Sequence, residues 1–450
     1  MKHENAFSRH GLFDARVPRY TSYPPANRFV PIADEATAAQ WMRTVPQGEA
    51  VSFYMHVPFC RRLCWFCACR TQGTKTDGPV DNYVAHLQRE ITLAGARLNG
   101  VKAERIHIGG GTPTLLTPQA VETLMATFDA HFPRMDGAEF SVEIDPTEID
   151  MPRLEALVAA GMNRASLGVQ DFDPKVQESI GRLQSYAETA FCVDGLRELG
   201  VTNINLDILY GLPFQTLDTL NDTLDKVLAL DPDRIAAFGY AHVPWMSRRQ
   251  SLIPEDALPD PRMRLVLFDA LAERLTTAGY IQIGIDHFVK PHDGLASALA
   301  EKRLHRNFQG YTDDASPWLI GLGASAISRY PQGYLHNATS TADYLARIAD
   351  GHFATKRGIA MSGNQFLVAE LIEQMMCYGR IEIGRLTTGT AEDHAQLRRK
   401  MQDLATEFAP FVTLSGDNLH VDKAAYPLLR ILAARLDEET LDGSSHAVAV

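Results

Sequence analysis

The feature that most constrains the fold is a regular alternation of short apolar runs with longer amphipathic segments, which begins at residue 51. Strands that alternate with helices pair in parallel through right-handed crossovers, so this pattern predicts a curved parallel sheet or partial barrel. The predicted strands are residues 51–58, 105–109, 139–144, 164–169, 203–210 and 234–240. The predicted helices are residues 80–98, 118–132, 151–161, 185–199, 216–230 and 261–278.

Polar residues and glycines stand where each of the six predicted strands ends. In barrels of this kind the carboxyl ends of the strands build the active site. Six such positions in succession are hard to explain as surface loops, so we predict that they share one site. They are His56, Cys60, Gly109–Gly111, Glu143, Asp145, Gln170, Asp207 and His242.

The pattern divides the chain into four parts. We predict an N-terminal arm over residues 1–50, a partial barrel over 51–290, a barrel-associated segment over 291–360 and a small, mostly helical domain over 361–450. The arm contains the proline-rich run 18–25, which cannot be a helix interior and is expected to wrap onto the body. Within the last domain, residues 364–378 and 391–408 are predicted helices and 411–421 a hairpin. A seventh run, 281–285, is expected to extend the sheet, and the last eight residues are expected to be untethered.

Composition narrows the functional class. The net charge of −12 over 450 residues argues against general nucleic-acid binding, which needs a basic face. No apolar stretch reaches the roughly 18 residues of a membrane span, and the first residues lack the apolar core of a secretory signal. We therefore expect a cytoplasmic protein that binds neither nucleic acid nor a membrane.

The strongest chemical signal is a cluster of four cysteines, Cys60, Cys64, Cys67 and Cys69. Thiolates are soft ligands that suit iron–sulfur clusters, zinc or copper(I), and in a reducing compartment such a cluster favours metal binding over disulfides. The spacing of the first three lets one loop wrap one side of a cubane and leave one iron open. Zinc is the alternative, but zinc sites usually draw two cysteine pairs from separated segments, and no second pair exists here.

Other candidates accompany the cysteines. Gly109–Gly111 lets backbone N–H groups approach an anionic or polar ligand, although a plain tight turn is the alternative. Glu143 is a candidate acceptor for a ribose or an ammonium group, whereas Asp145, before a proline, fits a helix cap better. Asp207 lies in an apolar strand, so it must be paired or functional, and pairing with Arg182 is the ordinary structural outcome.

The cysteine spacing, after a strand that ends in His-Val-Pro-Phe, resembles the radical S-adenosylmethionine (SAM) superfamily. Further runs make the chain similar to the bacterial oxygen-independent coproporphyrinogen III oxidases, from about residue 10 to the end. These runs are residues 18–24, 54–60, 168–172, 210–213, 240–242, 284–288 and 305–311. The resemblance implies that Cys60, Cys64 and Cys67 bind one 4Fe–4S cluster, whose fourth iron binds SAM, and that Cys69 is not a ligand.

The resemblance also implies a fold and an activity. The fold is α/β, a partial (β/α)6 TIM-like radical SAM barrel with an N-terminal arm and a small, mostly helical C-terminal domain. The activity converts two propionates of coproporphyrinogen III to vinyl groups, with loss of carbon dioxide, giving protoporphyrinogen IX in haem synthesis. It further implies two molecules of SAM, and we expect a monomer that takes electrons from a small redox protein such as flavodoxin or ferredoxin.

Carried over by motif, the resemblance implies two sets of cofactor contacts. Contacts with the cluster-bound SAM are implied for Tyr54, Gly110, Glu143 and Ile327. Contacts with a second SAM are implied for Phe66, Gly111, Thr112, Gln170, Arg182, Asp207 and Ala241. Arg19 and Arg306 are hypothetical partners of the substrate carboxylates, with a solvated surface role as the alternative. Cys69 is a candidate catalytic residue, with a small buried packing role as its alternative.

Some features depart from the family, and two rival functions stay open. The cysteine loop often reads Cys-Tyr-Phe-Cys-Gly-Cys-Asn in the family, and here Trp65, Ala68 and Arg70 differ. None of these is a ligand, so we expect tuning of the site. The rivals are an anaerobic haem-degrading enzyme and a haem-trafficking chaperone. Those chaperones generally lack the fourth cysteine and the Arg-Tyr-Thr-Ser-Tyr-Pro arm, and both are present here.

Overall fold

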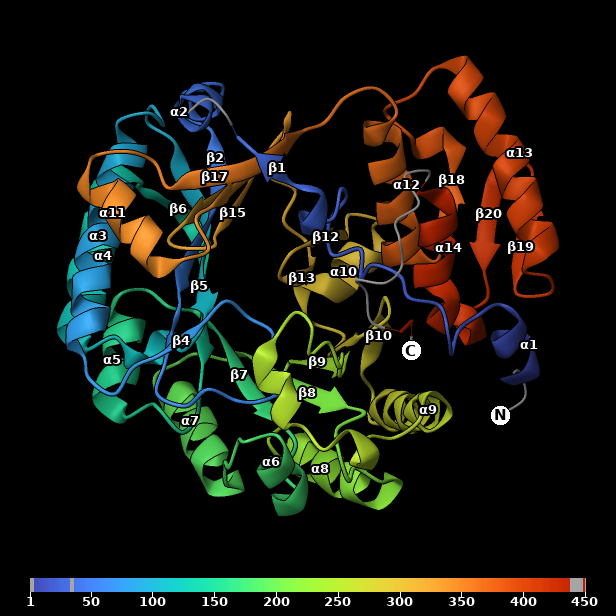
Figure 1. The fold of residues 1–450 in the computed structure, drawn as a ribbon, viewed down its shortest axis with the longest axis horizontal. Coiled ribbons are helices and arrows are strands. Elements are labelled where there is room, and N and C mark those ends of the chain that lie inside the picture. Colours follow the sequence, from blue (N-terminus) through green and yellow to red (C-terminus); the bar gives the residue numbers. More distant parts are fainter. Residues whose placement is uncertain (1–3, 33–35, 438–447, 450) are drawn as a thin grey trace.

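A parallel sheet forms the centre of the computed structural model, which describes residues 4–32, 36–437 and 448–449 (Figure 1). Six neighbouring strands pair in parallel in chain order, as the alternation predicts. They are β2 (Ala50–Val57), β5 (Lys102–Gly110), β6 (Arg134–Ile144), β7 (Arg164–Gln170), β8 (Asn203–Tyr210) and β9 (Arg234–Gly239). The predicted α/β partial barrel is therefore confirmed.

The crossover helices lie on the outside of this curved sheet (Figure 1). They are α3 (Gly78–Gly95), α4 (Pro118–His131), α5 (Met151–Ala159), α7 (Tyr186–Glu198), α8 (Leu217–Ala229) and α9 (Pro261–Thr277). Side-chain caps fix several of their starts, for example the reciprocal capping box of Ser185 and Glu188 at α7. The predicted cap at Asp145 is wrong, because Asp150 caps α5 and Asp145 instead accepts bonds from Thr147. A short helix, α6 (Pro174–Ser179), was not predicted.

Additional strands on both sides bring the sheet to 13 strands. Strand β14 (Leu319–Leu322) pairs in parallel with β2. Beyond it the antiparallel strands are β15 (Ile327–Tyr330), β16 (Gly333–Asn337), β17 (Thr355–Ala360) and the arm's β1 (Val30–Pro31). At the other edge, β10 (Ile281–Ile283) and β11 (His287–Val289) form a hairpin on β9. The seventh run thus extends the sheet, but as an antiparallel strand. The two edge strands, β1 and β10, do not pair with each other.

Smaller elements complete the barrel region. The short helices are α10 (Gly294–Ala300) and α11 (Thr341–Ala349). The short strand pairs are β3 (Phe59–Cys60) with β4 (Gln72–Gly73), and β12 (His305–Asn307) with β13 (Gly310–Thr312). None of the described helices is both long and apolar enough to cross a membrane.

Aromatic and aliphatic side chains fill the space between sheet and helices. Phe53 from β2 packs on Phe128 and Phe132 at ring-centroid distances of 5.0 and 4.5 Å, and all three are fully buried. Each such ring contributes roughly 1.5–3 kcal/mol by leaving water. This packing fixes α4 on the sheet and so fixes the turn that precedes it.

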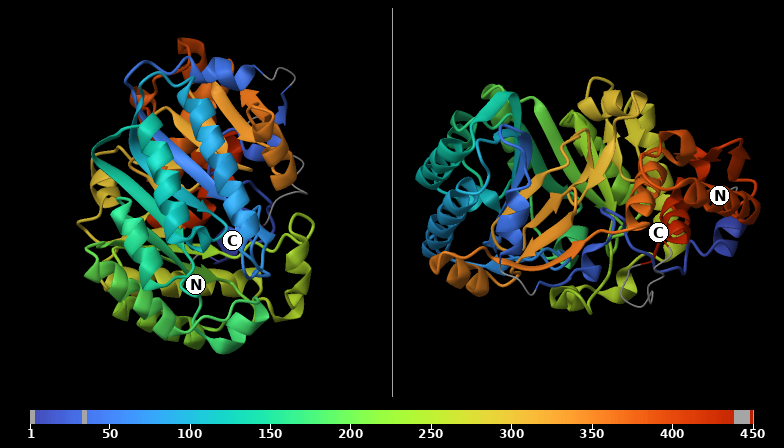
Figure 2. Two further views of the ribbon diagram at one scale, coloured as in Figure 1. Left: turned by 90° about the vertical axis from the view of Figure 1, so that its left-hand side faces the viewer. Right: turned by 90° about the horizontal axis from the view of Figure 1, so that it is seen from above.

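The C-terminal region is a separate packed unit on one side of the barrel (Figure 2). Its helices are α12 (Gln365–Tyr378), α13 (Ala391–Glu407) and α14 (Leu429–Leu436), beside a sheet of β18 (Arg380–Glu382), β19 (Val412–Ser415) and β20 (Asn418–Val421). The predicted hairpin around Gly416 is confirmed, since β19 and β20 pair antiparallel and Gly416 has the positive φ of 59° that such a turn requires.

The N-terminal arm wraps onto the body, as predicted. It contains α1 (Glu4–Arg9) and α2 (Thr37–Met42), and Phe7, Leu12 and Tyr20 share one core with the C-terminal helices. The expectation of an untethered C-terminus is wrong for Val448 and Ala449: Val448 pairs with Arg16, and the Ala449 N–H donates to the Ala15 carbonyl at 2.9 Å. Residues 443–447 and 450 of that stretch lie outside the described residues.

Candidate active site

The cysteine loop follows β2 at the carboxyl end of the parallel sheet. Cys64 is 7% exposed, Cys60 and Cys67 are half-buried, Cys69 is exposed, and all four thiols are free. Burial raises the pKa of Cys60 to about 11, while hydrogen bonds from Cys69 lower the pKa of Cys67. The charges of Cys67 and Cys64 add to the rise in the pKa of Cys60.

A buried arginine stands against the loop. Arg182 Nη1 lies 3.6 Å from Cys64 Sγ and 3.2 Å from Asp145 Oδ2, and Nη2 donates to the Gly168 carbonyl at 2.8 Å. A guanidinium at this place stabilises negative charge on sulfur. Pairing of Arg182 with Asp207, the ordinary outcome weighed from the sequence, does not occur.

The three glycines at the end of β5, where the chain turns, have no room for side chains. The Gly111 N–H donates to the Val57 carbonyl at 2.8 Å, which joins the turn to the strand before the cysteines. A Cβ atom at Gly109 would lie 2.5 Å from Glu143 Oε1, and one at Gly110 would overlap the His56 ring. Gly110 also has a φ of +108°, which other residues rarely adopt. Glycine at these positions therefore lets the backbone lie close to Glu143 and His56.

Glu143 is held in its charged form beside this turn. It accepts from the Gly110 N–H at 2.9 Å, and His107 Nε2 lies 3.2 Å from its other oxygen. Burial raises the pKa of Glu143, but the bonds from His107 and Gly110 outweigh it and lower the pKa overall. Tyr54 stacks on His107 with ring centroids 5.7 Å apart and contacts His56 Nδ1 at 2.9 Å through its hydroxyl. These contacts join Tyr54, His56, His107 and Glu143 into one polar wall beside the glycine turn.

Asp207 lies further along the same strand ends. Asn205 Nδ2 donates to it at 2.8 Å and Ser166 Oγ at 3.3 Å. Burial raises the pKa of Asp207 to about 6, and the charge of Glu143 adds to this effect. Its carboxylate therefore lacks a cationic partner among the described residues and is suited to accept bonds from a polar or cationic ligand.

The other expected cofactor contacts come from several different elements. Thr112 is buried, and its hydroxyl contacts the Cys60 thiol. Gln170 ends β7 with a φ of +68°, and Ile327 begins β15, half-buried. Phe66 lies in the cysteine loop, and Ala241 lies after β9 on the wall of a large cavity.

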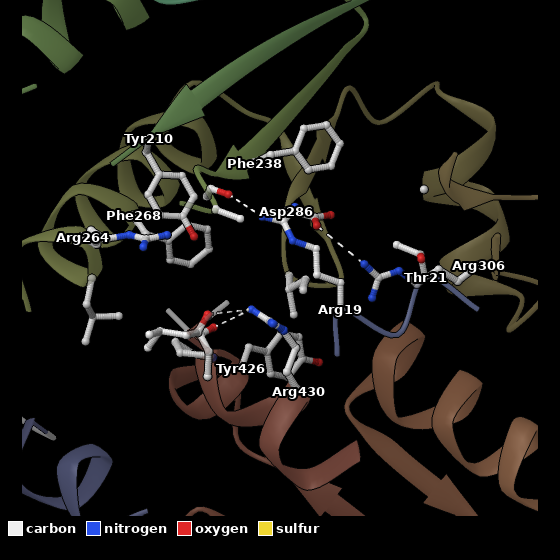
Figure 3. Close-up of a pocket in the computed structure, with 18 of the residues that line it drawn as sticks. Arg19, Thr21, Tyr210, Phe238, Arg264, Phe268, Asp286, Arg306, Tyr426 and Arg430 are labelled. Carbon is white, nitrogen blue, oxygen red and sulfur yellow. Dashed lines mark hydrogen bonds and ion pairs between the residues drawn. The ribbon is translucent and has the colours of Figure 1, made fainter. Parts of the chain in front are cut away.

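That cavity lies between the barrel, the arm and the C-terminal helices, and it holds about 400 Å³ (Figure 3). Four arginines from four different segments line it: Arg19 of the arm, Arg264 of α9, Arg306 of β12 and Arg430 of α14. Cys69 lines it as well, so the cavity reaches the cysteine loop. The sequence predicted Arg19 and Arg306 for this role, and the structure brings them together.

The cavity carries an excess of positive charge. Its described lining has one carboxylate, Asp286, which lies 3.8 Å from Arg306 Nη2. Arg430 donates to backbone carbonyls, including that of Val17 at 2.6 Å, and burial followed by the charges of the other arginines lowers its pKa to about 9. Arg306 Nε and Nη1 are buried and have no partner. Such a site gains stability when anions enter it.

The rest of the lining is largely apolar. Rings from strands, helices and loops stand between the arginines, as Figure 3 shows for several of them. They are Tyr210, Phe238, Phe268, Phe308 and Tyr426. The cavity therefore suits a ligand with an apolar body and several carboxylates.

Sequence reasoning missed Arg264, Arg430 and Asp286. Asp286 lies in the run 284–288, one of the runs that resemble the family, so the sequence did offer a reason to select it. Arg264 and Arg430 carry no local signal, because each is one polar residue of an amphipathic helix. Only the packing of α9 and α14 around the cavity shows that they face it.

The donor set fits an iron–sulfur cluster. Three free thiols come from one loop, with the Arg182 cation beside Cys64, and thiolates are the ligands such clusters take.

Comparison with known proteins agrees with this geometry. The sequence model of the radical SAM superfamily matches residues 54–227. The chain is 48% identical over 451 residues to the oxygen-independent coproporphyrinogen III oxidase of Paracoccus denitrificans, with both chains covered in full. It is 38% identical to the Escherichia coli protein of that name, over 81% of this chain and 80% of that one.

A solved structure gives the same result. The structure of coproporphyrinogen III oxidase from Escherichia coli, described as a radical SAM enzyme, superimposes with a TM-score of 0.88 at 33% identity. The match covers 94% of this chain and 99% of that one. The likeness therefore includes the arm and the C-terminal helices as well as the barrel.

Proposed function

The chain belongs to the family of oxygen-independent coproporphyrinogen III oxidases, and on this premise we propose that it oxidatively decarboxylates two propionates of coproporphyrinogen III to vinyl groups. The observation that carries the proposal is the cavity with four arginines that reaches Cys69. Coproporphyrinogen III has an apolar macrocycle and four carboxylates, and this cavity offers apolar rings and four guanidinium groups. Protoporphyrinogen IX is the product.

Cys60, Cys64 and Cys67 would hold a 4Fe–4S cluster, and SAM would bind its open iron. Once bound, the pair supplies a carbon radical that removes a hydrogen atom from the substrate propionate. Arg182 places a fixed positive charge 3.6 Å from Cys64 Sγ, which stabilises thiolate ligation without a proton at that sulfur. Cys69, outside the ligand set, lines the cavity and stands between loop and substrate.

The glycine turn and the two carboxylates would bind SAM. Glu143 is charged and fixed by Gly110 and His107, so it can accept bonds from the amino group or the ribose. Tyr54 and Ile327 complete this set. A second SAM molecule would contact Phe66, Gly111, Thr112, Gln170, Arg182, Asp207 and Ala241, of which Ala241 lines the arginine cavity.

The arginines would hold the substrate carboxylates. In Figure 3 Arg264 lies on the left and Arg306 on the right, with Arg19 between them and Arg430 below. Asp286 lies between Arg19 and Arg306, and both lower its pKa after its bond with His287. A charged Asp286 orients the two guanidinium groups and leaves the remaining N–H groups for substrate.

The direct test uses anaerobically reconstituted enzyme with SAM, dithionite and coproporphyrinogen III. Vinyl products together with 5′-deoxyadenosine support the proposal. Tight haem binding without turnover would support the chaperone instead, and consumption of haem the degrading enzyme. R19A and R306A should raise the substrate KM with little change in SAM cleavage, whereas R399E, an exposed change in α13, should leave both unchanged.

We further propose that the enzyme acts as a cytoplasmic monomer that takes its electron from a small redox protein. Light scattering during size-exclusion chromatography tests the monomer, and a dimer peak would remove it.

A further inference from the structure

The segment 245–250 is hydrogen-bonded directly to the cysteine loop. The Ser247 hydroxyl donates to the Cys67 carbonyl at 3.0 Å, and Gln250 Nε2 donates to the Phe66 carbonyl at 2.7 Å. Arg249 Nη2 donates to the Cys69 carbonyl at 3.1 Å. The segment 245–250 is therefore the outer support of the loop that carries the proposed cluster, and it is joined to a proposed ligand residue through one hydrogen bond.

The outer side of this segment exposes large apolar side chains. Trp245 is 50% exposed, Met246 61% and Leu252 59%. Arg16 of the arm lies over the Trp245 ring at 5.3 Å, which leaves the indole presented at the surface. Tryptophan, methionine and arginine are the residues enriched at the centres of protein–protein interfaces.

The same surface is basic. A hollow of about 550 Å³ beside the loop is lined by Arg70, Arg248 and Arg249 together with Met246, and its described lining contains no Asp or Glu. The whole chain carries a net charge of −12, so this basic surface has the opposite sign to the charge of the chain as a whole. Local potential of this kind steers an acidic partner to one face.

We infer that Arg70, Trp245, Met246, Arg248 and Arg249, here called the basic rim, form the docking surface for an acidic electron-transfer protein of the flavodoxin class. The inference rests on the proposed function, which needs one electron delivered to the cysteine loop. At each docking the partner is oxidised by one electron and the cluster is reduced by one, and no covalent bond forms or breaks. Trp245 and Met246 supply apolar contact, and the arginines supply orientation and speed of association.

The substrate is the competing occupant of the hollow, since it is anionic and Cys69 lines both cavities. Two observations favour the protein. The exposed Trp245 and Leu252 lie outside the lining of the hollow, so a ligand confined to it leaves them uncovered, and the hydrogen bonds of Ser247 and Arg249 end on the cluster loop rather than on the arginine cavity.

The test compares W245A/R248E with a matched control, F191A/R399E. Phe191 is 46% exposed on α7 and Arg399 is exposed on α13, so the control removes one exposed ring and reverses one exposed charge elsewhere. Binding of a purified bacterial flavodoxin to the reconstituted full-length enzyme is measured by calorimetry at low and high salt. Thermal unfolding and the visible absorption of the cluster establish that each variant is folded and loaded.

The rim variant should bind flavodoxin at least about tenfold more weakly than wild type and the control, and its binding should lose most of its salt dependence. Turnover driven by dithionite should stay at the wild-type level in both variants. Unchanged flavodoxin affinity in the rim variant overturns the inference, and so does a raised substrate KM with dithionite, which would assign the rim to substrate entry. Loss of turnover with dithionite in wild type would instead refute the proposed function.

Discussion

At the scale of single residues, the site depends on groups whose neighbours leave them few alternatives. Gly110 lies against His56, Glu143 is fixed by two donors, and Asp207 is half-buried without an ion-pair partner among the described residues. The Asp207 arrangement costs stability if no ligand uses it, since burial disfavours its charged form. Substitution at these positions therefore separates folding from ligand binding.

Replacing Gly110 by alanine should abolish SAM cleavage. The new Cβ would overlap the His56 ring, and a φ of +108° strains any residue other than glycine. The matched control is G137A: Gly137 has a φ of +75° but nothing within 4 Å of an added Cβ, so it bears the backbone cost of roughly 1–2 kcal/mol alone. SAM affinity by equilibrium dialysis should fall at least about tenfold in G110A only. Equal losses in both would show that the close contact is unimportant.

Replacing Asp207 by asparagine should stabilise the protein while weakening SAM binding. The pKa of Asp207 is raised to about 6, so the folded state disfavours its carboxylate and stability falls as pH rises from about 4 through 6. Asparagine removes that cost, by about 1–3 kcal/mol at pH 8 and by less at pH 5. Urea unfolding of cluster-free protein at the two pH values measures this. A variant less stable than wild type at pH 8 contradicts the assignment of a half-buried, cation-free carboxylate.

At the scale of elements, the alternation of strands and helices is what the sequence determines best. All six predicted strands and helices exist because their apolar period and their caps agree locally. The edges are different: β10 turns back on β11 within a hairpin, and β14 pairs with β2, and β1 with β17, through residues far apart in the sequence. Arg264 and Arg430 could not be predicted for the same reason, because local periodicity does not say which helix closes a cavity.

The arm is the element whose docking completes the site, and Asp437 anchors it. Arg28 pairs with Asp437 at 2.7 Å, and the hydroxyls of Tyr20 and Tyr23 donate to the same carboxylate at 3.1 and 3.3 Å. The side chains of Arg28 and Asp437 are 8% and 3% exposed, so the pair is buried. Because Arg19 directly precedes this docked stretch, its position in the cavity depends on the anchor.

Replacing Asp437 by alanine should therefore destabilise the protein by about 3–5 kcal/mol, since it removes the carboxylate of a buried ion pair that also accepts from two tyrosine hydroxyls. The substrate KM should rise with little loss of SAM cleavage, because the cysteine loop is not part of this contact. The exposed pair Arg398–Asp417 provides the control, and D417A should leave the stability nearly unchanged. Thermal unfolding and product analysis measure both. If D437A left the substrate KM unchanged, the arm would not position Arg19.

At the scale of the whole molecule, the proposed substrate site exists only when separate parts meet. Its four arginines come from the arm, α9, β12 and α14, which are distant in sequence and lie around one cavity (Figure 3). Their mutual repulsion opposes this assembly, as the lowered pKa of Arg430 indicates. A ligand with several carboxylates removes the repulsion, so its binding should tie the arm and the C-terminal helices to the barrel.

Coproporphyrin III, which keeps the four carboxylates in a form stable in air, should accordingly slow hydrogen exchange in the arm and in α14 far more than in α3 to α5. At a concentration of about 100 Kd it should add about 2.7 kcal/mol of stability. A porphyrin with two carboxylates should protect less, because two arginines would keep no anion. In R306A the protection of the arm should shrink while exchange in α3 to α5 stays as in wild type, since Arg306 acts on the ligand and not on the barrel. Protection confined to the barrel would place the ligand outside the cavity and separate the four arginines from the substrate.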